Sequence, residues 1–263
     1  MKKLIIILIL ILTLTIPVLS EARMNMGIVG GGVSSVTALP CTGSNTFVGA
    51  PGAWESFEYG ADDTCCSDLT VTDTDGKINT QDTTLAVCGT YGVSFLVSDD
   101  TNTDNYISAD MGAGEDAAFR SVFYFRFSAF PDWKCVNLFY VGGSSSGTSS
   151  SNMREQICQA GAGYFIKAEG ASEDTSAGGT VAANTTYRME IDYIKNNTTT
   201  TKIYNAANSV IDTLVSTAAN NTSRYIVIGP VTYDSGYTGT IYYDTIQYHS
   251  AGSADLGPVD CTP

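Results

Sequence analysis

The chain has 263 residues, with 13 basic and 27 acidic side chains and a formal net charge of −14 at pH 7. Such an acidic surface argues against nucleic acid and anionic membranes as partners. Only 15% of residues are charged, and Gly, Ser, Thr and Asn are abundant, which is typical of an extracellular β protein. The length suits a single β-sandwich, since such domains can exceed roughly 200 residues.

The N-terminus predicts secretion. Two lysines precede an apolar run over residues 4–18, and Ser20 and Ala22 have the small-residue spacing of a signal-peptidase site. The run is shorter than the roughly 20 residues that a membrane span needs, although a retained anchor is the alternative. We therefore expect a signal peptide over residues 1–22 and a secreted or cell-surface protein with no membrane contact after cleavage.

Residues 23–50 are small, polar and glycine-rich, and we expect a flexible lead there. From residue 51 to 250, short β-branched and aromatic runs alternate with turn residues. The clearest alternation is in residues 119–127, which place phenylalanines on one face and Arg120, Val122, Tyr124 and Arg126 on the other.

Residues 186–194 alternate in the same way, and Tyr187, Met189 and Ile191 are expected to pack on the core with Phe123 and Phe125. Only residues 153–159 have the composition of a short helix. The pattern predicts an all-β fold, a two-sheet antiparallel jelly-roll sandwich over residues 51–250, followed by a tail over 251–263.

Residues 224–248 form two strand-like runs around a Gly/Ser/Asp connection, which indicates a hairpin. Strict alternation would place Tyr242, Asp244, Ile246 and Tyr248 on one face. A carboxylate on such a face needs a partner, which could be an arginine, a backbone turn or a metal ion.

All seven cysteines follow the predicted signal peptide, so disulfides are expected. Cys135 and Cys158 flank a Gly/Ser-rich loop and are the best pair, and Cys41 with Cys261 is an attractive second one. The single histidine, His249, and the absence of a Cys-x-x-Cys argue against a zinc site or a Cys/His nucleophile pair.

Four short stretches resemble the concanavalin A-like lectin/glucanase superfamily, in particular its laminin G-like jelly rolls. They are residues 54–60 (WESFEYG), 89–95 (GTYGVSF), 181–191 (VAANTTYRMEI) and 239–246 (GTIYYDTI). The resemblance covers roughly residues 54–250. It implies a two-sheet jelly roll with a concave face, a surface that members of the superfamily often use to bind carbohydrate.

Glucanases of that superfamily carry a strand motif of three acids, and Glu190-Ile191-Asp192 matches its first two. The third acid is missing, and Lys195 follows instead. A retaining hydrolase needs two suitably spaced carboxyl groups, so Glu190 and Asp192 are weak catalytic candidates. The alternative is a polar strand face, with these acids paired to Arg120 or Arg126.

Two calcium sites are conceivable, and calcium is the only cofactor that we expect. Glu58 and Asp244 would meet if the first and last strands are neighbours, and a salt bridge or capped turn is the alternative. Asp73, Asp75 and Asp82 lie in residues 71–82, which resemble a calcium loop lacking its first ligand. A solvated Asp-Gly turn is the alternative there.

The leading hypothesis is a secreted, non-catalytic carbohydrate-binding or adhesion domain whose partner is a polysaccharide or glycoconjugate. A self-associating structural component of a surface, virion or filament is the first alternative, and a glycoside hydrolase or polysaccharide lyase is the second. Aromatic rings and planar polar groups suit sugar recognition. The ligand-binding candidates are Arg120, Tyr124, Arg126, Trp133, Glu190 and Asp192.

Overall fold

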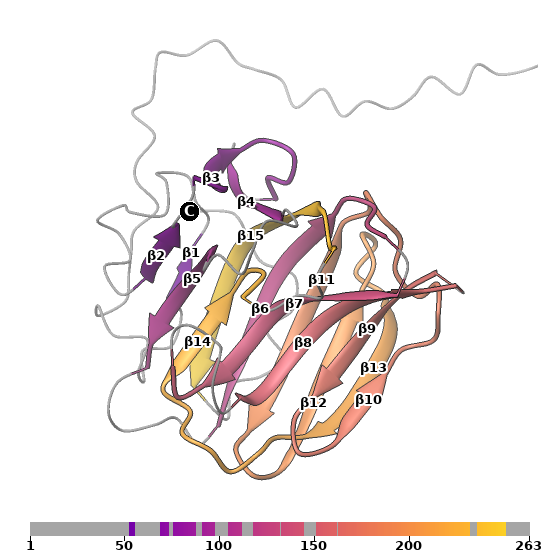
Figure 1. Cartoon of the computed structure of the whole chain (residues 1–263). Coiled ribbons are helices and arrows are strands. Elements are labelled where there is room, and N and C mark those ends of the chain that lie inside the picture. Colours follow the sequence, from indigo (N-terminus) through magenta and orange to yellow (C-terminus); the bar gives the residue numbers. More distant parts are fainter. Residues whose placement is uncertain are drawn as a thin grey trace, which may run out of the picture. The chain divides into compact units, whose positions relative to one another are not determined.

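The computed structural model describes residues 53–55, 69–73, 76–87, 91–97, 105–111, 118–131, 133–144, 151–161, 163–231 and 236–250. These residues all belong to one of the two units into which the chain divides, Leu39–Pro263. They form fifteen strands (Figure 1). None of them forms a helix of the length and hydrophobicity needed to cross a membrane.

The strands form two antiparallel sheets, which we call sheet A and sheet B. Sheet A has the order β13 (Val210–Thr217), β12 (Thr198–Tyr204), β11 (Tyr187–Ile194), β6 (Ala118–Phe127), β15 (Gly239–Ser250), β4 (Gly92–Val97) and β3 (Ile78–Asp82). The short strand β1 (Ala53–Glu55) also pairs with β15. Sheet B has the order β10 (Glu173–Thr175), β9 (Gly163–Glu169), β8 (Ser151–Ala160), β7 (Lys134–Gly142), β14 (Tyr225–Ile228), β5 (Asn105–Asp110) and β2 (Leu69–Asp73).

The inner faces of the sheets meet in one apolar core, which confirms the predicted all-β sandwich. Phe123 and Phe125 on β6 are fully buried and pair in register with Met189 and Tyr187 on β11. Phe123 also stacks on Phe139 of sheet B, with ring centroids 5.8 Å apart. Burial of each such side chain contributes roughly 1.5–3 kcal/mol.

The alternation of β15 is interrupted, so the predicted four-residue face is wrong. Two residues of β15, Thr245 and Ile246, lie opposite Phe123 alone, which is a β-bulge. Thr245 has a φ of 51°. Because of the bulge, Ile246 points into the core, whereas strict alternation would place it on the outer face. Asp244 stays on the outer side with Tyr242, where its carboxylate accepts hydrogen bonds from the N–H groups of Val87 and Thr245.

The segment predicted as a short helix is part of strand β8. Met153, Glu155 and Ile157 point into the core, whereas Arg154 and Gln156 face outward. Met, Arg, Glu and Gln favour helices in isolation, but pairing of β8 with β7 and β9 on both sides overrides that weak preference.

The sandwich is tied together where β10 of sheet B meets β13 of sheet A. The Val215 N–H donates to Asp174 at 2.8 Å, and the Thr217 N–H donates to the Ser172 hydroxyl at 2.8 Å. The Thr213 N–H donates to its neighbour Asp212 at 2.7 Å. Three edge amides of β13 are therefore taken by side-chain oxygens.

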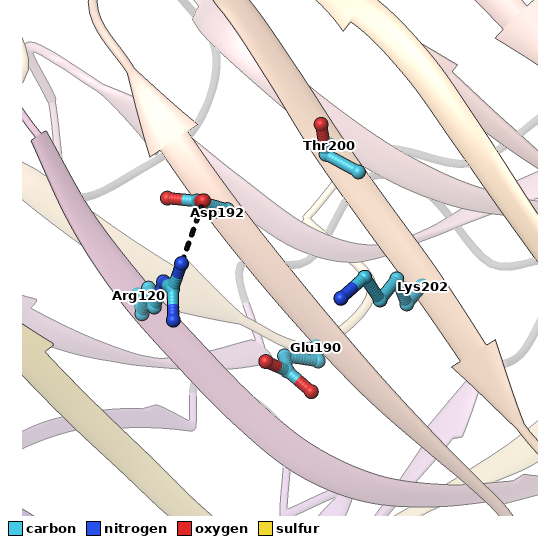
Figure 2. Close-up of a pocket in the computed structure, with 5 residues that line it drawn as sticks. All are labelled: Arg120, Glu190, Asp192, Thr200 and Lys202. Atoms are coloured by element: carbon cyan, nitrogen blue, oxygen red, sulfur yellow. Dashed lines mark hydrogen bonds and ion pairs between the residues drawn. The ribbon is translucent and has the colours of Figure 1, made fainter. Parts of the chain in front are cut away.

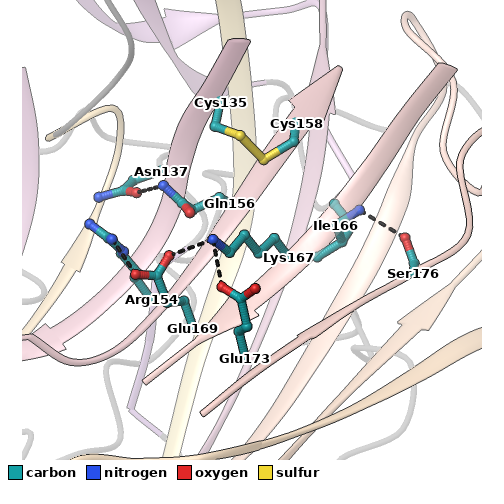
Figure 3. The surroundings of a disulfide bond; sticks show 10 residues. All are labelled: Cys135, Asn137, Arg154, Gln156, Cys158, Ile166, Lys167, Glu169, Glu173 and Ser176. Carbon is teal, nitrogen blue, oxygen red and sulfur yellow. Dashed lines mark hydrogen bonds and ion pairs between the residues drawn. A yellow bond between two sulfur atoms is a disulfide. The ribbon is translucent and has the colours of Figure 1, made fainter. Parts of the chain in front are cut away.

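A disulfide joins Cys135 on β7 to Cys158 on β8, as predicted (Figure 3). On the same outer face of sheet B, Lys167 bridges Glu169 at 3.0 Å and Glu173 at 2.8 Å. The other cysteines, including Cys41 and Cys261, lie outside the described residues.

We expect the double variant Cys135→Ala/Cys158→Ala to lose about 2–4 kcal/mol of unfolding free energy, because the bridge closes a loop with a sequence separation of 23. Urea unfolding under non-reducing conditions measures this loss. An unchanged unfolding midpoint would show that pairing of β7 with β8 alone holds this region.

One carboxyl group is enclosed in the core. The Glu155 side chain on β8 is fully buried, and the Thr201 hydroxyl on β12 donates to its Oε1 at 2.6 Å. Its Oε2 has no hydrogen-bond partner within the described part of the chain. Burial raises the pKa of Glu155 to about 8, and the Thr201 hydrogen bond, which lowers it, is the smaller effect. Glu155 is therefore a neutral acid at pH 7.

This raised pKa gives stability a predictable pH dependence. Between the ordinary pKa of 4.5 and about 8, the folded protein holds a proton that the unfolded chain has released. Unfolding free energy should therefore fall as pH rises through this window, by up to roughly 1.4 kcal/mol per pH unit. Glu155→Gln should remove most of the fall.

Urea unfolding at pH 5 and pH 8 tests this dependence, and Glu173→Gln, an exposed acid, serves as the control. The control should keep the fall that the parent shows. An identical pH profile for the parent and Glu155→Gln would contradict the assignment.

Candidate functional site

The outer face of sheet A is rich in polar side chains where β6, β11 and β12 lie side by side. We call this surface the polar face. The register places Arg120 of β6 opposite Asp192 of β11, and Asp192 opposite Thr200 of β12. One pair further along the strands, Glu190 lies between Val122 and Lys202.

A depression of about 220 Å³ opens on this face, lined by Arg120, Glu190, Asp192, Thr200 and Lys202. Figure 2 shows the Arg120 guanidinium reaching Asp192 and the amine of Lys202 extending from β12 toward Glu190 and Asp192. Because these residues alternate with core residues, the strands present all five side chains to the same side. The depression thus combines acidic, basic and hydroxyl groups at short range.

The two acids of the depression are held differently. Arg120 Nη2 lies 3.2 Å from Asp192 Oδ2, and the two side chains are 20% and 43% exposed. Such a partly solvated pair contributes little to stability. Its members remain accessible to a ligand.

Glu190 is held much more firmly. Arg188 Nη1 lies 3.6 Å from Glu190 Oε2, with both side chains at most 5% exposed. The Tyr204 hydroxyl donates to the same oxygen at 3.0 Å, and the Arg188 guanidinium lies 3.7 Å from the Tyr204 ring centroid. This buried cluster fixes the Glu190 carboxylate at the floor of the face.

The other end of the polar face is aromatic. Tyr242 of β15 lies opposite Arg126 of β6, and Tyr124 lies two residues before Arg126 on the same face. All three side chains are half-buried. The Arg126 Nε is buried and has no hydrogen-bond partner among the described residues.

The structure brings together five of the six ligand-binding candidates: Arg120, Tyr124, Arg126, Glu190 and Asp192. Trp133 is separate, since it precedes β7 of sheet B and does not line the depression. It is 75% exposed and has a φ of 59°, which is rare for a bulky residue.

Sequence reasoning missed Thr200, Lys202, Arg188 and Tyr204 as members of the face. A partial signal exists for the two residues on β12 that line the depression. A polar turn follows residue 194, so a return strand beside β11 can be expected, but only the register of the pair places Lys202 and Thr200 beside Glu190 and Asp192. The aromatic cover of Arg188 by Tyr204 depends on side-chain packing.

The weak catalytic candidates, Glu190 and Asp192, both line the depression, and each forms an ion pair with an arginine. Asp192 pairs with Arg120, one of the two partners that the sequence predicted, and Glu190 pairs with Arg188 instead. A retaining hydrolase needs one carboxyl as nucleophile and a second as proton donor. The arginine contacts favour a binding role for both acids.

Three of the acids proposed for calcium lie within the described residues, and each accepts hydrogen bonds from other groups of the protein. Asp244 accepts from two backbone amides, and Asp73 accepts from the N–H groups of Lys77 and Ile78 at 2.9 and 3.4 Å. Partial burial of Asp82 opposes its ionisation, but hydrogen bonds from Thr84 and Ser94 outweigh it and lower the pKa. Glu58 and Asp75 lie outside the described residues. Within those residues, no three His, Cys, Asp or Glu side chains are grouped to hold one metal ion.

No protein-family model matches the sequence, and no curated protein matches it either. Among solved structures, the cellulose-induced protein Cip1 is 12% identical with a TM-score of 0.52, over 76% of this chain and 97% of that one. A carbohydrate esterase from the Shiga toxin-encoding bacteriophage phi24B is 11% identical with a TM-score of 0.50, over 75% of this chain and 99% of that one. A protein of unknown function from Shewanella oneidensis is 16% identical with a TM-score of 0.49, over 78% and 89%. At these identities the likeness to Cip1 and to the esterase shows a shared fold alone.

We expect Arg188→Met to destabilise the protein by about 3–5 kcal/mol, because it leaves the buried Glu190 carboxylate without the cation that pairs with it. Arg120→Met is the matched control and should cost less than about 1 kcal/mol, because its partner Asp192 is solvated. Urea unfolding measures both. Equal losses in the two variants would contradict the distinction between the buried and the exposed pair.

Proposed function

From the concanavalin A-like jelly-roll fold that the chain has, we propose that it is a secreted, non-catalytic carbohydrate-binding protein whose sugar site is the polar face of sheet A. The observation that carries the proposal is the depression lined by Arg120, Glu190, Asp192, Thr200 and Lys202, with Tyr124 and Tyr242 on the same side of the sheet. Fold alone would not carry it, since one fold hosts many functions.

The chemistry of the face suits a sugar chain. A pyranose presents hydroxyl groups at its edge and C–H groups on its faces, so it needs hydrogen-bonding groups and flat apolar surface together. Guanidinium and carboxylate groups provide several hydrogen bonds with fixed geometry. Tyrosine rings add contact area at a small entropic cost, because they have few rotatable bonds.

The fixed groups favour recognition because little has to be ordered when the ligand binds. The Arg188 and Tyr204 contacts hold Glu190 before any sugar arrives, and β-strands on either side hold the backbone. A preorganised site avoids part of the entropic cost of association.

Two further observations support the proposed setting. The Cys135–Cys158 disulfide agrees with an oxidising, extracellular compartment. Two solved structures of similar fold are those of a cellulose-induced protein and a carbohydrate esterase. This is an analogy between folds, and the site geometry carries the argument.

A glycan array on the purified protein, run with calcium and with chelator, tests the proposal. We expect selective binding by the parent and at least about a tenfold loss in Tyr124→Ala and in Lys202→Ala, the loss expected when a good contact is removed. Trp133→Ala is the matched control, because it removes an exposed aromatic side chain that does not line the depression. It should bind as the parent does.

Other outcomes separate the alternatives. Loss of binding on chelation would place calcium near the site, and release of reducing ends or unsaturated products would move the proposal to an enzyme. A blank array with calcium present would overturn glycan binding. Concentration-dependent assembly in light scattering would then favour the structural alternative.

A further inference from the structure

The polar face has the opposite charge to the protein as a whole. The chain carries 13 basic and 27 acidic side chains, a net charge of −14. On the outer side of β6, β11 and β12, however, four basic residues accompany only two acidic ones: Arg120, Arg126, Arg188 and Lys202 against Glu190 and Asp192. A locally positive surface on an acidic protein attracts anions to that place and repels them elsewhere.

The four basic residues of the face exceed what its two acids can neutralise. Arg120 pairs with Asp192 and Arg188 with Glu190, and the count still leaves an excess of positive charge. Arg126 lies beyond these pairs, and its nearest acid on β15, Asp244, is fully buried and accepts from the N–H groups of Val87 and Thr245.

Arg126 presents a cation on the polar face. Its side chain is half-buried, and its Nε is shielded from solvent, so the rest of the guanidinium is the part that an anion can contact. Tyr124 and Tyr242 flank it on the polar face. Because Nε is shielded, an incoming carboxylate would meet the two terminal nitrogens of the guanidinium, which match its two oxygens in a bidentate arrangement.

The basic groups are spread along the strands. Arg120 and Arg126 lie six residues apart on β6, which corresponds to about 20 Å of strand. Lys202 lines the depression near the Arg120 end. A single small anion could not reach both ends, whereas a polymer with repeated negative charges could.

We infer that the ligand of the polar face is an acidic polysaccharide whose sugars carry carboxylate groups, lying along β6 with one carboxylate on Arg126 and another near Arg120 and Lys202. This inference rests on the proposed function and narrows it to a class of glycan. The tyrosines would contact the sugar rings between the charged positions.

The test compares one polymer in a charged and an uncharged form, and adds a sulfated polymer with a different backbone. The purified protein is titrated by calorimetry with polygalacturonate, with the same polymer after extensive methyl esterification, and with dextran sulfate. We expect the free acid to bind at least about tenfold more tightly than the ester, since each carboxylate–guanidinium contact is charge-assisted. Binding should weaken as salt rises above about 0.1 M, where exposed charges are screened.

Variants locate the contact. Arg126→Gln should lose about tenfold or more of the affinity for polygalacturonate and little of any affinity for the ester. Arg224→Gln is the matched control, because Arg224 is an exposed arginine of the sheet B side that is bound bidentately to Asp110. It should bind as the parent does, and circular dichroism should confirm that both variants are folded.

The results of these titrations separate failure of the acidic ligand from failure of sugar binding. Equal binding of acid and ester, or equal losses in the Arg126 and Arg224 variants, would overturn the acidic ligand while leaving sugar binding intact. Binding of dextran sulfate alone would overturn the carboxylate in favour of sulfate. If no polymer binds and the glycan array is also blank, the proposed function itself fails.

Discussion

The two-residue period of β6 links the inside of the sandwich to its polar face. Every odd residue from Phe123 to Phe127 enters the core, so Tyr124 and Arg126 between them must point outward. Sheet pairing then transmits this choice to β11, where Met189 and Ile191 are buried and Glu190 and Asp192 face the other side. A slip of one residue would bury the arginines and expose the phenylalanines. The core therefore fixes which groups a ligand can meet.

Three buried carboxyl groups in the sandwich are stabilised in three different ways. Glu155 stays neutral between the sheets, Glu190 is matched by a guanidinium and a phenol, and Asp244 is surrounded by backbone amides. The Glu155 contact with Thr201 ties sheet B to sheet A, and the Glu190 contact with Tyr204 ties β11 to its neighbour β12. The third stabilises an irregular backbone, because the amide of Thr245 at the bulge is one of its donors.

Sequence reasoning succeeded where a feature depends on local period and failed where it depends on packing between distant strands. The sandwich, the Cys135–Cys158 bridge and the face shared by Arg120, Glu190 and Asp192 follow from alternation and spacing. The bulge at Thr245 does not, because an extra residue is defined only by its partner strand. Nor does the strand at residues 151–160, where helix-favouring residues are held by neighbours on both sides. The grouping of Lys202 with Glu190 requires the exact register of β11 and β12, which alternation alone leaves open.

The closed edge at β13 bears on how copies of this protein could join one another. Chains that polymerise by strand addition need a row of unsatisfied amides for the incoming strand to pair with. The amides of Thr213, Val215 and Thr217 are already taken by Asp212, Asp174 and Ser172. A second copy therefore finds no template on this side of the sandwich. A filament built by strand addition would therefore have to start from another edge of the sandwich, because the β13 edge resists β-type aggregation.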